Sequence, residues 1–154
     1  MSIFDITNFT PLDDNLFTSG QPTEAQFAEL ARQGLQVVIN LALQTSTNAL
    51  PDEAGTLQSL GLEYIHIPVV WEEPQLSALE QFFAAMENHQ AKNILVHCAL
   101  NYRASAFTAL WRVLKQGWEP EKAFAAQRSI WNLDEYPVWK TFVEQALETH
   151  SKRT

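Results

Sequence analysis

Cysteine is almost absent from this chain. Cys98 is the one cysteine among 154 residues, so no disulfide bond can form within the chain, and this usage suits a reducing compartment such as the cytoplasm. The first residues lack the basic region and the apolar core of a secretory signal, and no apolar run reaches the length of a membrane span. We therefore expect a cytoplasmic protein that does not enter a membrane.

Basic residues are also few. The chain has 10 Lys and Arg residues against 18 Asp and Glu, which gives a formal net charge of -8. Nucleic acids and anionic membrane surfaces bind to basic faces, so neither is expected as the main partner. With 46% hydrophobic and 18% charged residues, the composition is that of an ordinary globular protein. We expect one domain over residues 1–154, with a loose amino-terminal segment over residues 1–14.

Apolar runs typical of strands alternate with segments of helical periodicity. A short strand at residues 16–19 precedes a helix that begins at Thr23, where Gln26 completes a capping box, and that ends at Gly34. Further strands are expected at residues 35–41, 62–67 and 93–96, and further helices at residues 52–60 and 77–88, before Gly117, and from Pro120 and Pro137 onward. This alternation predicts an α/β fold, with helices on both faces of a mostly parallel sheet of about four to five strands.

The stretch from Asn93 to Ser105 carries the strongest chemical signal. Residues 93–96 form an apolar run and helical periodicity begins soon after, so Cys98 lies where a strand ends and a helix begins. The first turn of a helix presents unpaired N–H groups and a positive dipole end, which stabilise oxyanions and thiolates. Arg103 adds a planar fork that matches two phosphate oxygens. A lone cysteine at such a position is more often a buried apolar residue, and a lone arginine at a helix start is more often a solvated charge. The two together favour an anion site centred on Cys98.

These residues resemble the phosphate-binding loop of a known superfamily. His97-Cys98, a short loop, Arg103 and a following hydroxyl are similar to the loop of cysteine-dependent protein tyrosine and dual-specificity phosphatases, which have five residues between Cys and Arg where this chain has four. The four-residue spacing, the Ser19-Gly20-Gln21-Pro22 turn and the Val38-Ile39-Asn40-Leu41 strand resemble the beta-lactamase hydrolase-like phosphatases, a bacterial group of that superfamily. The resemblance covers about residues 16–118 and implies a three-layer phosphatase-like α/β fold.

The resemblance also implies a reaction at Cys98 that needs no metal and no cofactor. The Cys98 thiolate would attack phosphorus and form a cysteinyl-phosphate, while Arg103 and the loop amides would hold the phosphate oxygens. His97 would favour the thiolate through a structural hydrogen bond, although a plain core histidine fits the sequence equally well. Ser105 would donate a hydrogen bond to the Cys98 sulfur during hydrolysis. The loop residues expected to bind substrate are Ala99, Leu100, Asn101 and Tyr102.

The short loop changes the expected shape of the phosphate cradle. One residue fewer removes one amide and turns the arginine by roughly 100° on a regular helix. Asn101 stands where the resembling loop commonly has a glycine, and asparagine tolerates the left-handed backbone conformation better than most residues. We expect a tighter cradle that still binds an oxyanion, with Tyr102 at its rim.

The expected site also needs a proton donor for the leaving group. The resembling phosphatases use an Asp from a loop before the Cys strand, and the matching loop here carries Glu72 and Glu73 instead. A glutamate can serve if burial raises its pKa, and Trp71 would supply an apolar wall. We favour Glu73 over Glu72, with Asp134 and Glu135 as later alternatives; simple solvation of the glutamate pair is the common outcome on a protein surface.

Two other functions fit the same residues. A rhodanese-type sulfurtransferase would hold a persulfide on a cysteine in a similar strand-to-helix loop. A binding-only domain would recognise a phosphate group without turnover, which the short loop and the missing Asp favour. For the phosphatase, the expected partner is a phosphorylated protein or small molecule, and the oligomeric state stays open.

Overall fold

A computed structural model describes residues 5–151 of the chain. Its centre is a sheet with the strand order β1-β2-β5-β3-β4, in which β1 is antiparallel to β2 and the other neighbours are parallel. The mostly parallel sheet expected from the sequence is thereby confirmed. The strands are β1 (Thr10–Pro11), β2 (Leu16–Ser19), β3 (Val37–Asn40), β4 (Glu63–His66) and β5 (Ile94–His97).

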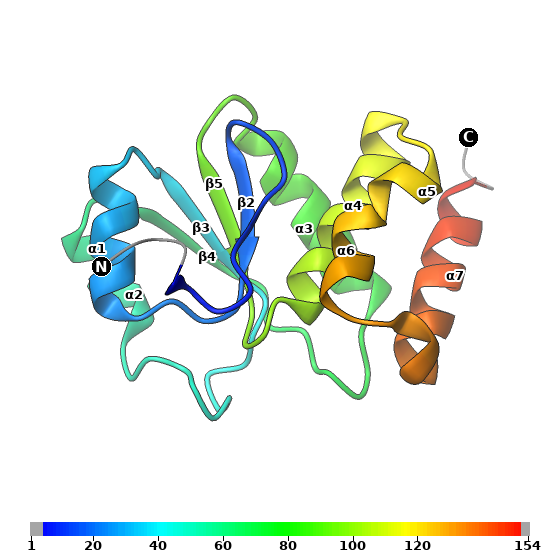
Figure 1. The fold of residues 1–154 in the computed structure, drawn as a ribbon, viewed down its shortest axis with the longest axis horizontal. Helices are drawn as coiled ribbons and strands as arrows, with labels where there is room; N and C mark the ends of the chain where they lie inside the picture. Colours follow the sequence, from blue (N-terminus) through cyan, green and yellow to red (C-terminus); the bar gives the residue numbers. More distant parts are fainter. Residues whose placement is uncertain (1–4, 152–154) are drawn as a thin grey trace.

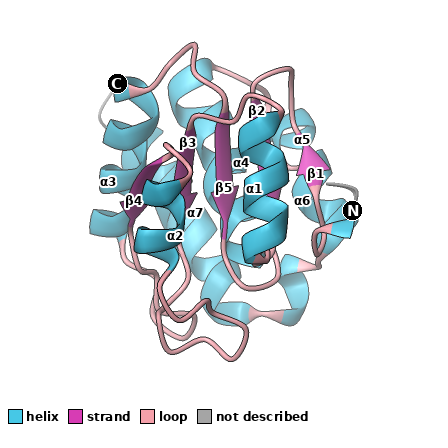
Figure 2. Cartoon of the chain, turned by 90° about the vertical axis from the view of Figure 1, so that its left-hand side faces the viewer, coloured by secondary structure: helices cyan, strands magenta, loops and turns pink. Residues whose placement is uncertain are grey.

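Helices cover both faces of this sheet, which confirms the three-layer expectation (Figure 1). Figure 2 looks onto the face covered by α1 (Glu24–Arg32) and α2 (Glu53–Ser59). The capping box predicted at the start of α1 is present, since Gln26 N donates to Thr23 Oγ1 and Thr23 N to Gln26 Oε1. The remaining helices are α3 (Leu76–Asn88), α4 (Tyr102–Gln116), α5 (Pro120–Ala123), α6 (Ala125–Ile130), a 3-10 turn η2 (Leu133–Glu135) and α7 (Pro137–Ser151).

Two apolar clusters lie on opposite faces of the sheet. Successive strand side chains point to opposite faces, so Val38 packs with Phe27 of α1 and Leu57 of α2, while Val37 and Ile39 join the larger cluster. That larger cluster continues through α3 and α4 to α7, which forms the outer wall of the molecule in Figure 1. Because helices bury both faces of the sheet, its inner strands are continuous apolar runs in the sequence.

The amino-terminal segment differs from its expected loose state. Ile6 is only 2% exposed, Thr10–Pro11 pairs with β2, and the Thr7 carbonyl accepts a 2.7 Å hydrogen bond from Gly20 N. The expectation was wrong for these residues, because a two-residue strand has no readable alternation and its order comes from pairing with β2. Residues 1–4 of the predicted segment lie outside the described residues.

The carboxyl ends of the four parallel strands meet at one edge of the sheet. Gly20 follows β2, Leu41 follows β3, Ile67 follows β4 and Cys98 follows β5. Active sites of open α/β sheets form at this edge. Within residues 5–151, we find no helix with the length and apolar character that a membrane span requires.

Candidate active site

The loop from Cys98 to Asn101 joins β5 to α4 and is held on its outer side. Cys98 N donates to the Ser19 carbonyl over 3.3 Å. The Ala99 carbonyl accepts from Gln21 N and from Asn48 Nδ2, both at 3.1 Å. The loop is therefore held to neighbouring segments by the donor of Cys98 and by the carbonyl oxygen of Ala99, which points away from the loop interior.

Asn101 makes the turn into α4 in the left-handed conformation, with φ of 72°, as its residue type predicted. Its side chain is buried and faces away from the loop interior, because Nδ2 donates to the Asn8 carbonyl (2.8 Å) and to Thr18 Oγ1 (3.0 Å). No side chain caps the start of α4. The first-turn N–H groups of this helix therefore lack an intrahelical partner and a capping oxygen.

Cys98 and Arg103 line one cavity of about 310 Å³ at the start of α4. Arg103 is buried, and its Nη1 donates 2.8 Å to the Val69 carbonyl, which orients the guanidinium group. The four-residue spacing thus still brings the cysteine and the arginine together. The described residues that line the cavity are Trp71, Cys98, Ala99, Leu100, Tyr102, Arg103 and Tyr136.

Aromatic rings form one wall of this cavity, where Trp71, Tyr102 and Tyr136 line it and Trp131 packs against all three. Tyr102 stacks in parallel on Trp131, with ring centroids 5.0 Å apart and an angle of 2° between the rings. Trp71 lies 5.3 Å from Tyr136 between centroids, and the Trp71 carbonyl accepts a hydrogen bond from Trp139 Nε1. The sequence reasoning missed Tyr136 and Trp131, for which an aromatic-rich segment on either side of η2 was the only signal.

The hydroxyl of Ser105 is engaged beneath this wall. It donates 3.0 Å to the Tyr102 carbonyl and accepts 2.9 Å from Trp131 Nε1. The Ser105 hydroxyl therefore donates its proton to the Tyr102 carbonyl in this structure, and not to the Cys98 sulfur as expected. Ser105 instead ties the first turn of α4 to the aromatic wall.

The candidate proton donors lie outside the Cys98 cavity. Glu72 and Glu73 are exposed and line an adjoining cavity of about 380 Å³ against the start of α7. Asp134 is exposed and forms a 3.0 Å ion pair with Lys140, and Glu135 is also exposed. Among the described residues that line the Cys98 cavity there is no carboxylate.

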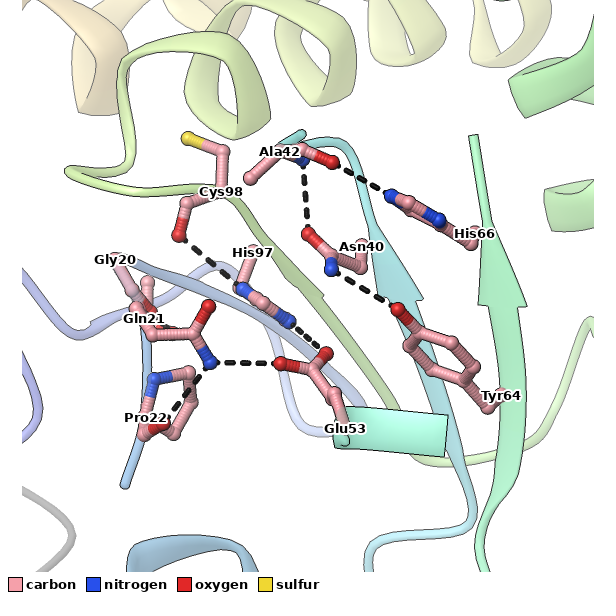
Figure 3. A network of polar contacts seen from close by, with 11 residues as sticks. Gly20, Gln21, Pro22, Asn40, Ala42, Glu53, Tyr64, His66, His97 and Cys98 are labelled. Atoms are coloured by element: carbon pink, nitrogen blue, oxygen red, sulfur yellow. Dashed lines mark hydrogen bonds and ion pairs between the residues drawn. The ribbon is translucent and has the colours of Figure 1, made fainter. Parts of the chain in front are cut away.

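A buried polar network supports the loop from behind (Figure 3). The ring of His97 is fully buried, with Nε2 2.7 Å from Glu53 Oε2 and Nδ1 3.2 Å from the Cys98 carbonyl oxygen. Gln21 Nε2 donates 2.7 Å to Glu53 Oε1. Burial alone raises the pKa of Glu53, but the hydrogen bond and charge of His97 and the hydrogen bond from Gln21 outweigh it, so the net shift is downward. Sequence reasoning missed Glu53, because nothing local marks a glutamate on α2 as the partner of a histidine on β5.

The comparisons with known proteins fit this geometry. The sequence profile of the family described as DSP-PTPase phosphatase fused to NAD+ kinase matches residues 5–145. The chain belongs to this family. A phosphatase family of the dual-specificity and protein tyrosine type is thus shown, as the loop predicted, and the chain is a phosphatase-like hydrolase of that type.

Relatives and solved structures extend this family assignment. A beta-lactamase hydrolase-like protein of Xylella fastidiosa (strain Temecula1) is 29% identical over 109 residues, which cover 67% of this chain and 24% of the relative. The chain therefore spans about a quarter of the length of that curated relative. The resemblance to the beta-lactamase hydrolase-like group is confirmed.

Two solved structures share the whole architecture. A candidate phosphatase of the DUF442 class from Shewanella putrefaciens CN-32 is 36% identical, with a TM-score of 0.88 and 96% of each chain covered. The structure of Tk-PTP in its active form is 20% identical, with a TM-score of 0.74, covering 96% of this chain and 98% of the other. At that identity the second likeness concerns the fold alone.

Proposed function

We propose that the chain hydrolyses phosphomonoesters through a covalent intermediate on Cys98. The sulfur would attack phosphorus in line, so that an S–P bond forms as the P–O bond to the leaving group breaks, and water would then cleave the S–P bond and release phosphate. The observation that supports this most directly is that Cys98 and Arg103 line one cavity at the uncapped start of α4.

Phosphate binding is assigned to the loop and to Arg103. One of the five N–H groups of the Arg103 guanidinium donates to the Val69 carbonyl. The remaining N–H groups can donate to phosphate oxygens. Ala99, Leu100 and Tyr102 line the cavity, whereas Asn101 would contribute its left-handed backbone and not its side chain. Developing negative charge on phosphorus oxygens is stabilised by N–H donors fixed in advance, and such donors are supplied by the first turn of α4.

Glu73 is the carboxylate that we assign as proton donor to the leaving group, with Glu72 as the alternative. Trp71 and Tyr136 line the Cys98 cavity, and their chain neighbours Glu72 and Pro137 line the adjoining one. A leaving group that extends from the Cys98 cavity past Trp71 would thus approach the loop that carries both glutamates. Asp134 is a weaker assignment because it is paired with Lys140.

The substrate class proposed is a phosphorylated protein or small molecule, handled in a reducing compartment such as the cytoplasm. A thiolate nucleophile requires that Cys98 stay reduced. The net charge of -8 disfavours nucleic acid and anionic membrane partners, because both bind to basic surfaces.

The test is hydrolysis of an aryl phosphate between pH 5 and 8, with a chelator present, by wild type, Cys98→Ser and Glu73→Gln. We expect Cys98→Ser to lower kcat/KM by at least about a thousandfold, since removing a nucleophile removes the covalent route. Glu73→Gln should lower kcat and alter the basic limb of the pH profile. Glu119→Gln, an exposed carboxylate just before α5, is the matched control and should behave as wild type.

A binding-only role is the second candidate, and the lack of a carboxylate among the described lining residues of the Cys98 cavity favours it. In that case wild type would hydrolyse no faster than Cys98→Ser, yet both would still bind vanadate or phosphate. Trp71 in the cavity wall provides a fluorescence signal for that titration.

A further inference from the structure

The adjoining cavity, of about 380 Å³, has an apolar part and an acidic part. Pro74, Val138 and Phe142 give its apolar lining, and Glu72 and Glu73 give its charged lining. Among the described residues that line it there is no lysine, arginine or histidine. Lysine and arginine side chains bury an apolar stem while their cationic head stays in a polar environment. The lining of the adjoining cavity is complementary to a side chain of that kind.

The charge around the adjoining cavity is predominantly negative. Lys140 precedes the lining residue Thr141 on α7, but it forms a 3.0 Å ion pair with Asp134, which raises the pKa of the Lys140 ammonium. A carboxylate therefore balances this positive charge, and the whole chain has a formal net charge of -8. A cationic group in the cavity would be attracted and an anionic group repelled.

Two aromatic residues connect this cavity to the Cys98 cavity. Trp71 and Tyr136 line the Cys98 cavity, and the residue that follows each of them in the chain lines the adjoining cavity. The centroids of the two rings lie 5.3 Å apart, with 79° between the ring planes. The faces of aromatic rings attract ammonium and guanidinium groups. A substrate that extends from one cavity to the other thus passes rings that also favour a cation.

The loop between β4 and α3 joins the expected phosphate site to the acidic lining. The Val69 carbonyl accepts from Arg103 Nη1, and the Val70 carbonyl accepts a 3.1 Å hydrogen bond from Glu73 N. Between them, the Trp71 carbonyl accepts from a side-chain N–H of α7. Because these bonds fasten one short loop at three points, the guanidinium group and the two glutamates keep a fixed separation.

We propose that the adjoining cavity selects phosphorylated peptides in which a lysine or arginine lies beside the phosphorylated residue. This inference rests on the proposed function, because it names the substrate class of the Cys98 site. The phosphate would bind at Arg103, and the stem of the basic side chain would lie on Val138. Glu72 is the carboxylate assigned to the cationic head, while Glu73 stays assigned to the leaving-group oxygen. Glu72 and Val138 are both exposed, so a polypeptide can approach the cavity from solvent.

The test compares synthetic phosphotyrosine peptides that carry lysine, norleucine or glutamate directly before or directly after the phosphotyrosine. Norleucine keeps the apolar stem of lysine and removes its charge. Affinity is measured by tryptophan fluorescence on Cys98→Ser, which lacks the thiol nucleophile, and kcat/KM is measured on wild type. We expect the lysine peptide to bind about fivefold more tightly than the norleucine peptide, as for a well-placed exposed ion pair, and the glutamate peptide to bind most weakly.

Three further substitutions, made in Cys98→Ser, test whether the adjoining cavity causes this preference. Glu72→Gln should lower it to less than about twofold. Val138→Lys places a cation in the cavity at a position that is 51% exposed, and it should abolish the preference. The matched control is Gln58→Lys, which adds the same charge at an exposed position on α2, against the other face of the sheet, and should keep the fivefold preference.

Equal affinities of Cys98→Ser for the lysine and norleucine peptides would overturn the proposal, as would a preference that survives Val138→Lys. The proposed function fails in a different way. Selective binding by Cys98→Ser without hydrolysis by wild type would refute the phosphatase reaction and support the selectivity of the cavity. Hydrolysis of all the peptides with equal kcat/KM would support the phosphatase reaction and overturn the selectivity.

Discussion

Gly20 follows β2 and lies directly against the Cys98 loop, and adding one methyl group there tests whether that contact shapes the phosphate cradle. A Cβ on residue 20 would lie 2.6 Å from the Ala99 carbonyl oxygen, where real Cβ contacts are essentially never below 3.0 Å. The opposite side is closed by Thr7, whose Cγ2 would lie 3.0 Å away. The Ala99 carbonyl must therefore retreat by about 0.4 Å in Gly20→Ala, at a cost of about 1–3 kcal/mol in stability.

A displaced Ala99 also moves the cradle. The loss of one well-aligned, charge-assisted hydrogen bond is worth about 1.5 kcal/mol, or about tenfold in affinity. We expect Gly20→Ala to lower the free energy of unfolding in urea and to weaken vanadate inhibition about tenfold. Gly117→Ala is the control, because it forces φ of 74° on alanine in open space and costs about 1–2 kcal/mol far from the loop. Equal vanadate affinity in Gly20→Ala and wild type would refute the reasoning.

Two further predictions concern the loop and the network behind it. Asn101→Ala should lose about 2 kcal/mol in urea unfolding, because it strains the left-handed turn and leaves the Asn8 carbonyl without its donor; Asn101→Gly should lose less, and an equal loss would show that backbone strain is unimportant there. The lowered pKa of Glu53 means that its stabilising contribution is present above the usual carboxyl range and is lost as pH falls through the folded value, so the acid loss of stability should be shallower in Glu53→Gln; identical acid slopes would contradict this.

The local sequence pattern was enough to predict the loop between β5 and α4 that carries Cys98. Cys98 and Arg103 are flanked by an apolar strand and by a helix with clear periodicity, so their meeting at one junction follows from two short-range signals. The left-handed turn at Asn101 was likewise a property of the residue type. The α/β class followed from the alternation of such segments.

Features that depend on contacts between residues far apart in the chain could not be predicted from the sequence. The order β2-β5-β3 brings α2 beside the end of β5 and so pairs Glu53 with His97, although 44 positions separate them in the chain. Glu73 follows Trp71 closely, yet the turn of the loop places it in the adjoining cavity. Glu73 therefore does not line the cavity that Trp71 lines, although the two residues are close in sequence.

The aromatic wall has a consequence for how the site is completed during synthesis. Cys98, its loop and Arg103 are all present once residue 103 has been made, but Tyr136 joins the cavity from beyond η2, and Trp139 donates to the Trp71 carbonyl only when α7 packs. A nascent chain that ends before η2 would therefore hold Cys98 and Arg103 without the Tyr136 side of the cavity. Packing of α7 fixes Trp71 on that side, so the shape of the cavity that Cys98 lines depends on the carboxyl-terminal segment.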